Sequence, residues 1–280
     1  MGAIERGKRP RAGLSLREFW HIGREQWLTQ RSTLIRGFVW LLGPLGVHAR
    51  IRNAHLLRVL VGLALPPDAH VLDAGCGHAY AVFWLAQRFP SYHLVGIERD
   101  ATLVNANRQI ATTLGLTGVE FRQESVEAVG GEAAYDLVFS IDVLEHVDDD
   151  AGVLRCFRRA LKPNGLLLLH LPLRHQEQRR VFPIFRRHTV EDHVRDEYTP
   201  DEIKAKLKEA GFRLRWQGWG FGLAGELAFE LNYLGWRRPW LRNLVALLTF
   251  PLAFPLAYLD VRFPPERGNS LLLLAEPVEA

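Results

Sequence analysis

Residues 71–80, VLDAGCGHAY, place two glycines and an alanine directly after a short apolar run that ends in Asp73. Glycine turns of this kind follow a strand and let the backbone approach a nucleotide-like cofactor. A dinucleotide-binding turn would need a third glycine where Tyr80 stands, and the Asp73 carboxylate would lie close to the bound pyrophosphate. A P-loop would need a Gly-Lys-Ser/Thr ending, which the stretch lacks. The turn therefore suits a cofactor with a cationic head and no phosphate, as in S-adenosylmethionine.

Two ionisable residues near the middle of the chain are candidates for proton transfer. Group transfer to an oxygen or nitrogen needs a base only where that atom must lose a proton. His146, in the sequence LEHV, follows an apolar run, and histidine has a pKa suited to this task. Asp142 is a second candidate, no stronger than the first. The alternative interpretation is that Glu145 and His146 only tie the following helix to the sheet.

The elements that must position these residues alternate in character from Ala69 onward. Short apolar runs, which predict strands, alternate with segments whose apolar residues recur every three or four positions, which predict helices. The predicted strands are HVLDAG, HLVGIE, VEFRQ, YDLVFSID, LLLLHL, FRLRWQG and NSLLLLAEP. Because several of these strands are apolar throughout, we expect an α/β fold whose parallel sheet is covered by helices on both faces.

Local signals predict where some helices begin and end. Thr199 is a natural N-cap, Pro200 suits the first helical position, and Glu202 completes a capping box. Gly211 then ends this helix. The segment DDAGVLRCFRRALKPNG predicts another helix, terminated by Pro163 and an Asn-Gly turn.

Two segments depart from the alternation of strands and helices. Residues 14–63 are helical in texture and break at GPLG, and residues 219–268 form a long apolar stretch between the last two predicted strands. We therefore expect an N-terminal helical extension or cap over residues 1–63 and a core formed by residues 64–218 and 269–280. Residues 219–268 are then a helical insertion before the last strand.

Four motifs in this order resemble class I S-adenosylmethionine-dependent methyltransferases of the small-molecule branch. VLDAGCGHAY is similar to the first motif, D-x-G-x-G-x-G, with Ala79 in place of the last glycine. Glu98 ends HLVGIE, where the family places an acid that accepts hydrogen bonds from both ribose hydroxyls. Glu124 and Ser125 match the position that takes the adenine amino group. YDLVFSIDVLEHV and LKPNGLLLLHLP resemble the motifs of the fourth and fifth strands.

The resemblance implies a fold, a cofactor and a reaction. The fold is a Rossmann-like, seven-stranded, mostly parallel sheet. The cofactor is S-adenosyl-L-methionine, converted to S-adenosyl-L-homocysteine, and the acceptor is a small molecule, with O-methylation favoured and a lipid-like or amphipathic compound expected. The implied cofactor contacts are Asp73, Gly75, Gly77, Ala79, Glu98, Glu124, Ser125 and Ser140.

The loop after the fifth predicted strand is rich in arginine. It carries Arg174, Arg179, Arg180, Arg186 and Arg187, which could clamp a phosphate or a carboxylate of an anionic acceptor. The alternative interpretation, which we favour from the sequence, is a solvated loop whose arginines pair with its own acids.

The apolar insertion has two interpretations. Residues 244–259 are apolar apart from Thr249 and the Tyr258 hydroxyl, but Pro251 and Pro255 predict interruptions that argue against a spanning helix. The segment can form a helical hairpin that packs on the core, completing an apolar pocket or a homodimer interface. It can also form, with residues 34–47, a face that lies on a membrane, because aromatic and basic residues precede it. Those residues are Trp236, Arg237, Arg238, Trp240 and Arg242.

Composition limits the remaining function classes. A net charge of +4 is weak evidence for nucleic acid, and SIDVLEHV stands where an amino-methylating enzyme would carry Asn/Asp-Pro-Pro-Tyr/Phe. A nucleic-acid methyltransferase and a non-catalytic protein that kept the cofactor fold are therefore the alternatives. Two cysteines are too few for a disulfide framework, which predicts a cytoplasmic protein. The histidines and cysteines do not have the spacing of zinc ligands, so the sequence predicts no metal site.

Overall fold

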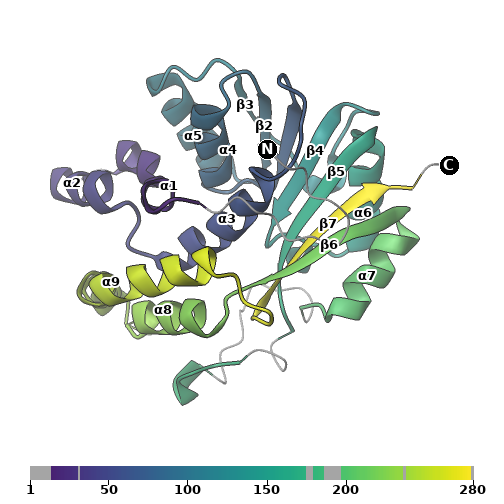
Figure 1. The fold of residues 1–280 in the computed structure, drawn as a ribbon. Helices are drawn as coiled ribbons and strands as arrows, with labels where there is room; N and C mark the ends of the chain where they lie inside the picture. Colours follow the sequence, from purple (N-terminus) through teal and green to yellow (C-terminus); the bar gives the residue numbers. More distant parts are fainter. Residues whose placement is uncertain (1–13, 31, 175–178, 186–196, 236–237, 279–280) are drawn as a thin grey trace.

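The computed structural model describes residues 14–30, 32–174, 179–185, 197–235 and 238–278 of the 280-residue chain. Seven strands form one sheet in the order β3-β2-β1-β4-β5-β7-β6 (Figure 1). Their bounds are β1 His70–Ala74, β2 His93–Glu98, β3 Val119–Gln123, β4 Tyr135–Ile141, β5 Leu161–Pro172, β6 Phe212–Gly220 and β7 Ser270–Pro277. β7 runs antiparallel to β5 and β6, and the other pairs are parallel. The predicted seven-stranded, mostly parallel sheet is confirmed.

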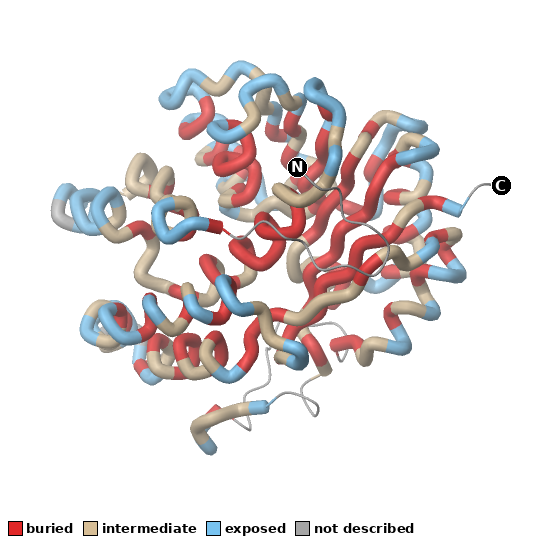
Figure 2. The backbone as a smooth tube through the Cα atoms, viewed as in Figure 1, coloured by how far each residue is buried: buried red, intermediate tan, exposed pale blue. Residues whose placement is uncertain are grey.

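Helices cover both faces of the sheet (Figure 1). Their bounds are α1 Leu16–His21, α2 Thr33–Leu42, α3 Val47–Leu60, α4 Tyr80–Arg88, α5 Ala101–Thr113, α6 Asp150–Ala160, α7 Pro200–Glu209, α8 Leu223–Tyr233 and α9 Pro239–Arg262. α6 and α7 share one buried cluster with the sheet, and α3, α4 and α5 share the other. Central strands are therefore buried on both faces (Figure 2). Residues 271–275 of β7, for example, are at most 1% exposed, which explains their unbroken apolar sequence.

α7 begins and ends as its sequence predicts. Thr199 Oγ1 accepts a hydrogen bond from the Glu202 amide at 3.3 Å, and the Glu202 carboxylate accepts one from the Thr199 amide at 2.8 Å. Pro200 occupies the first helical position, and Gly211 adopts a φ of 82° just beyond the helix. The predicted capping box and glycine stop are confirmed.

The predicted end of α6 is wrong by several residues. The helix ends at Ala160, and Leu161 already pairs with Tyr135 of β4. Because the ring of Pro163 disfavours a helical conformation in the residue before it, the helix stops ahead of the proline rather than at it. The Asn-Gly pair then lies within an irregularity of β5, after which the regular pairing of β5 with β4 resumes at Leu166.

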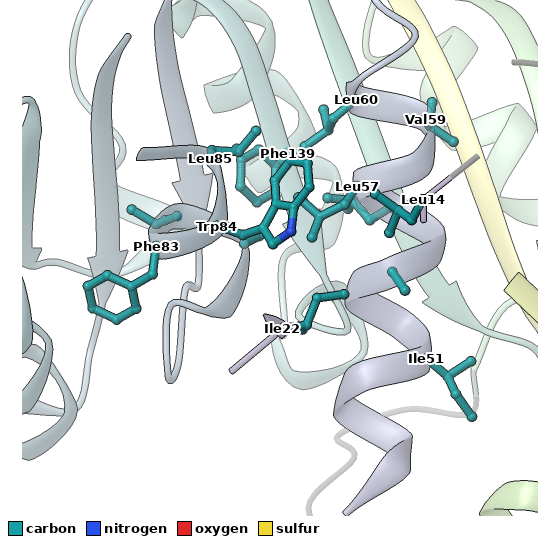
Figure 3. Packing of buried hydrophobic residues seen from close by; sticks show 14 of the residues in the cluster. Leu14, Ile22, Ile51, Leu57, Val59, Leu60, Phe83, Trp84, Leu85 and Phe139 are labelled. Atoms are coloured by element: carbon teal, nitrogen blue, oxygen red, sulfur yellow. The ribbon is translucent and has the colours of Figure 1, made fainter. Parts of the chain in front are cut away.

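The N-terminal helices pack onto the core through α3. In Figure 3, Leu57 and Leu60 of α3 lie beside Trp84 of α4 and Phe139 of β4, and Leu14 and Ile22 cover them. The predicted helical texture of residues 14–63 is confirmed, including the break after α2 at Gly43, whose φ is 71°.

Arg50 of α3 ties the N-terminal helices together. Its guanidinium is buried and donates to the carbonyls of Phe19 and Trp20 in α1 at 3.4 and 2.9 Å. It also donates to the carbonyls of Leu42 and Pro44 at 2.8 and 3.2 Å. Trp20 and Leu42 lie in the last turns of α1 and α2, where carbonyls have no amide four residues further along the helix to pair with. The cation therefore lies at the negative end of both helix dipoles.

We expect Arg50→Met to lower the free energy of unfolding by about 3 kcal/mol or more, because it leaves several buried carbonyls without a donor. Urea denaturation measures this loss. Arg155→Met is the matched control, since Arg155 is exposed and only 3.7 Å from an exposed Asp149 carboxylate. Such surface pairs contribute about 0–1 kcal/mol. Equal losses in the two variants would contradict the role given to Arg50.

The insertion before β7 consists of α8 and α9. The expectation that Pro251 and Pro255 interrupt the helix is wrong, because α9 is continuous from Pro239 to Arg262. Both prolines lie on the exposed side of the helix, where water can hydrate the carbonyls that they leave unpaired. In the part of the chain that the structure describes, residues 241–262 are one helix long and apolar enough to cross a membrane by length and composition.

One side of α9 packs firmly against the rest of the protein. Phe254 contacts the rings of Phe19 and Trp20 in α1, with centroid distances of 5.2 and 4.9 Å. Near the end of the helix, Asp260 Oδ2 lies 2.8 Å from His55 Nε2 of α3, and both side chains are buried. α9 is thereby fixed along the side of the domain.

Candidate active site

A cavity of about 750 Å³ opens at the carboxyl ends of β1, β2 and β4. The strand order reverses between β1 and β4, and open α/β sheets bind their ligands at such a switch point. The residues that line the cavity come from α3 and from the carboxyl ends of four strands and the turns that follow them. These strand ends and turns lie within residues 73–80 for β1, 98–99 for β2, 125–127 for β3 and 141–148 for β4.

The turn after β1 depends on its glycines. Gly75 has a φ of 81°, and a Cβ at this position would approach a methyl group of Val143 to 2.5 Å. The amides of Gly75 and Cys76 both donate to the carbonyl of Ile97 in β2, at 3.0 and 2.8 Å. Ala79, which replaces the last glycine of the motif, has a φ of 53° and is buried. An alanine in this left-handed conformation costs roughly 1–2 kcal/mol relative to the right-handed one, so the departure from the motif is a local strain.

Glu98 is held in place by backbone donors. Its Oε2 accepts a hydrogen bond from the Gly77 amide at 3.1 Å, and its Oε1 accepts one from the Asp100 amide at 2.9 Å. An ionised carboxylate has about four lone-pair sites, so these two bonds leave acceptor capacity on both oxygens. Glu98 lines the cavity with that capacity available for a pair of hydroxyl groups.

Asp73 lies at the end of β1 and is 3% exposed. Its Oδ1 has no hydrogen-bond partner among the described residues. Burial, reinforced by the negative charge of Glu98, raises the pKa of Asp73 well above its ordinary value. A buried carboxylate without compensation is costly, so the site favours a cationic ligand beside it. The ammonium and sulfonium of S-adenosylmethionine fit this requirement.

Asp142 follows β4 in a strained conformation, with a φ of 51°. Arg52 Nη1 of α3 donates to its Oδ2 at 3.0 Å, and His170 Nδ1 of β5 lies 2.6 Å from its Oδ1. Burial alone would raise the pKa of Asp142, but the charges of His170 and Arg52 and the hydrogen bond of His170 hold it well below the usual range. Asp142 is therefore a fixed carboxylate that lines the cavity, rather than a group ready to take a proton.

His170 and Arg52 contact the Asp142 carboxylate but were not predicted from the sequence as site residues. His170 is buried within β5, in the otherwise apolar run LLLLHL, and its Nε2 has no partner in the described part of the chain. An ionisable residue inside an apolar strand is unusual, and this position could have marked His170 as a candidate site residue. Arg52 is one of several arginines on α3, and nothing in their spacing separates it from Arg50 or Arg58.

His146 lies where its sequence position predicts. It ends the short 3-10 helix Leu144–His146 after β4 and lines the cavity. Its neighbour Glu145 is fully buried, and neither of its carboxylate oxygens has a hydrogen-bond partner among the described residues. Burial, with the charge of Asp142 added, raises the pKa of Glu145 well above its usual range. Glu145 is thus a core residue, and His146 is the member of this pair that lines the cavity.

The structure corrects two of the predicted cofactor contacts. Ser140 is buried within β4, and its hydroxyl donates to the carbonyl of Ala74 at 2.8 Å, so it ties β4 to β1 instead of lining the cavity. Glu124 lines a separate groove of about 660 Å³ on one face of β2 and β3, together with Glu120 and Arg122. Because strand side chains alternate between faces, residue 124 follows 120 and 122 to that face. Ser125 lines the cavity, as predicted.

The arginines of the loop after β5 have partners in the described part. Both oxygens of Glu202 accept bonds from Arg174 Nη2 at 2.7 Å, and Arg180 Nη1 donates to Glu226 Oε1 at 2.5 Å. The amide of Arg179 donates to Asn269 Oδ1 at 2.7 Å. Arg174 and Arg180 thus form ion pairs, as the second interpretation expected, but with acids of α7 and α8 rather than with acids of the loop itself. Neither arginine lines the cavity. Arg186 and Arg187 lie outside the described residues.

A comparison with known protein families assigns the chain that forms this sheet and glycine turn to a family. The family described as "Methyltransferase domain" matches residues 48–216, which is more than half of the chain. The chain belongs to this methyltransferase family. The resemblance to class I S-adenosylmethionine-dependent methyltransferases is thereby confirmed.

Relatives of named activity match over shorter stretches. Trans-aconitate 2-methyltransferase of Azoarcus sp. (strain BH72) is 30% identical over 119 residues, which are 42% of this chain and 45% of that protein. Ubiquinone biosynthesis O-methyltransferase of Methylocella silvestris is 34% identical over 117 residues, which are 41% of this chain and 42% of that protein. The chain therefore matches less than half the length of these two relatives.

Solved structures share the fold over most of the chain. The YcgJ protein from Bacillus subtilis has a TM-score of 0.55 at 16% identity, covering 81% of this chain and 99% of that protein. A TehB-like SAM-dependent methyltransferase from Corynebacterium glutamicum has a TM-score of 0.50 at 13% identity, with coverages of 91% and 97%. At such low identities these similarities show the fold alone.

Proposed function

We propose that the protein transfers a methyl group from S-adenosyl-L-methionine to an oxygen of a small, amphipathic acceptor, leaving S-adenosyl-L-homocysteine. The observation that carries the proposal is the buried Asp73 carboxylate, which faces a cavity that Glu98 also lines and whose Oδ1 has no hydrogen-bond partner among the described residues. A cationic cofactor with ribose hydroxyls satisfies both groups. The matched family and the named relatives support the same reaction class.

The bound cofactor would supply an activated methyl group, so the protein's task is to hold the acceptor in line with it and to exclude water. Asp73 would balance the positive charge, and Glu98 would accept hydrogen bonds from the ribose. His146, which also lines the cavity, would take the proton of the hydroxyl that is methylated. Asp142, fixed by Arg52 and His170, would accept a hydrogen bond from a second donor group of the acceptor and orient it.

An aromatic cluster packs behind the pair formed by Asp142 and His170, and its rings are not among the residues that line the cavity. The ring of His48 on α3 lies 5.1 Å from Phe221, 5.0 Å from Phe229 and 6.4 Å from Tyr233, centroid to centroid. Burial and the charge of Arg52 lower the pKa of His48 to about 3, so its ring is neutral. Phe221 also lies 6.5 Å from the His170 ring, so the cluster supports the side of His170 that does not meet Asp142.

Two measurements on the purified protein test the proposal. Titration calorimetry with S-adenosylmethionine and S-adenosylhomocysteine is expected to show binding of both, and each should raise the melting temperature. The protein is then incubated with S-adenosylmethionine and with phenols, quinols, carboxylic acids or long-chain alcohols, and mass spectrometry detects methylated products. No binding by folded protein would remove the cofactor assignment. Binding without any methylated product would favour the non-catalytic alternative.

A further inference from the structure

Exposed apolar side chains gather on two helices. Of the fifteen large apolar side chains exposed in the described residues, nine belong to α2 or to α9 and the residue that follows it. They are Ile35, Phe38, Trp40 and Leu41 on the first helix, and Leu244, Leu248, Leu252, Leu259 and Phe263 on the second. We call these nine residues the apolar face. Both helices lie on the same side of the molecule, with α1 between them (Figure 1).

On α9 the exposed residues form a stripe opposite the packed side. At about 100° per residue, positions 244, 248, 252, 259 and 263 fall within about 100° of the helix circumference. The buried residues Ala246, Phe250, Ala253, Phe254, Ala257 and Val261 fall on the opposite side. The helix is therefore apolar on its outer side as well as its inner side. A helix of this kind is buried in a larger core or in a membrane, and the outer stripe has no cover in this protein.

The exposed charges on α2 and α9 themselves have one sign. Residues 26–67 and residues 231–259 contain no aspartate and no glutamate, and Asp260 of α9 is buried. Exposed arginines accompany the stripe, with Arg36 on α2, Arg242 in the first turn of α9 and Arg262 at its end. Exposed apolar side chains that share a helix with positive charge are typical of helices that lie in the headgroup layer of an anionic membrane. A second copy of the chain would bring the same arginines against each other, which disfavours a symmetric dimer through this face.

The packing of α9 decides between lying on a membrane and crossing it. Its inner side contacts α1 through Phe254 and carries Asp260, whose buried carboxylate meets His55. Its Ala246 carbonyl accepts a hydrogen bond from Asn232 of α8 at 3.3 Å. A spanning orientation would require these contacts to break and Asp260 to enter hydrocarbon, whereas a flat orientation keeps all of them.

From these observations we propose that the apolar face docks the protein onto anionic membranes, with α2 and α9 lying flat in the headgroup layer. This inference does not depend on the methyl-transfer reaction.

Sedimentation with vesicles tests the proposal. The full chain is mixed with vesicles of phosphatidylcholine alone or with one-third phosphatidylglycerol. We expect it to sediment with the anionic vesicles, and high salt to weaken binding only partly, because apolar burial supplements the charge attraction. In the double variant Leu248→Gln, Leu252→Gln we expect at least about a tenfold lower partition coefficient, since burying each leucine contributes strongly. These two side chains are 70% and 59% exposed, so their replacement spares the core.

A control replaces two exposed apolar side chains elsewhere by the same residue. Leu114 and Val278 are 38% and 49% exposed away from α2 and α9, and the variant Leu114→Gln, Val278→Gln is expected to bind vesicles as the wild type does. Wild-type protein that stays in the supernatant with anionic vesicles overturns the proposal, as does a stripe variant that binds equally well. A dimer in analytical ultracentrifugation that dissociates in the stripe variant, without vesicle binding, would instead assign the face to a second copy.

Discussion

Asp73→Asn is expected to weaken S-adenosylmethionine binding by about 10- to 100-fold and, at the same time, to stabilise the ligand-free protein. The first effect follows because hydrogen bonds to charged groups contribute about 1.5–3 kcal/mol. The second follows because the native carboxylate is buried beside Glu98 and its Oδ1 has no partner among the described residues. The amide keeps the shape and removes the charge. Titration calorimetry and thermal denaturation measure the two effects.

The stability gain of Asp73→Asn has a defined pH dependence. The folded-state pKa of Asp73 is raised, so the folded protein binds this proton more tightly than the unfolded chain does. Wild-type stability therefore falls as the pH rises from about 4, the ordinary aspartate value, through the raised pKa. We expect the variant and the wild type to melt together in acid and to diverge toward neutral pH. Each kcal/mol corresponds to roughly 2–4 °C in melting temperature for a chain of this size.

The control for this prediction is Asp68→Asn, because Asp68 is exposed and precedes β1 at the opposite edge of the sheet. It should change neither cofactor affinity nor melting temperature. If Asp73→Asn binds the cofactor as tightly as the wild type, Asp73 does not face the cationic group.

The second large effect is expected from Asp142→Asn, which should lower kcat by about 100-fold or more while cofactor affinity changes little. The asparagine loses the negative charge that Arg52 and His170 hold in place, so it can no longer orient an acceptor hydroxyl in the same way. His146→Ala should also lower kcat by about 100-fold, since general-base catalysis contributes typically 10²–10⁴-fold. Steady-state kinetics with the acceptor found by screening measures both losses.

His170→Gln separates positioning from proton transfer. Its side chain is buried and contacts Asp142, so we expect a smaller loss in kcat and no change in the pH dependence of kcat. Asp201→Asn is the control, because the Asp201 side chain is 98% exposed. Wild-type turnover in His146→Ala would leave His146 a structural residue. Wild-type turnover in Asp142→Asn would exclude Asp142 from orienting the acceptor.

The sheet and the position of Asp73 and Glu98 in the cavity could be predicted because their determinants are local. HLVGIE and VEFRQ coincide with β2 and β3, since each is a short run whose neighbours in sequence also end it. Asp73 and Glu98 were found because residues that follow parallel strands meet at one edge of a sheet. The two errors at Glu124 and Ser140 have the same origin. The pleat of the strand and the turn that follows it determine the face on which a residue near the strand end lies. The position of the residue in a sequence motif specifies neither the pleat nor the turn.

The remaining features depend on contacts between distant segments. Arg50 meets carbonyls about thirty residues away, and His170 meets Asp142 across two neighbouring strands. Pro251 and Pro255 predicted a break in α9, but packing of the inner side against α1 and α8 holds the helix together. Propensity is a weak guide where tertiary packing determines the outcome.

Arg50 and Arg52 stand two residues apart on α3, and each holds a different part of the protein. Arg50 holds the ends of α1 and α2, and Arg52 holds the Asp142 carboxylate. A helix moves as one body over so short a span, so α3 connects the N-terminal helices mechanically to the Asp142 carboxylate. If Asp142 orients the acceptor as proposed, a ligand that shifts α1 and α2 would change acceptor affinity. A bound acceptor would then bias α1 and α2 by the same free energy.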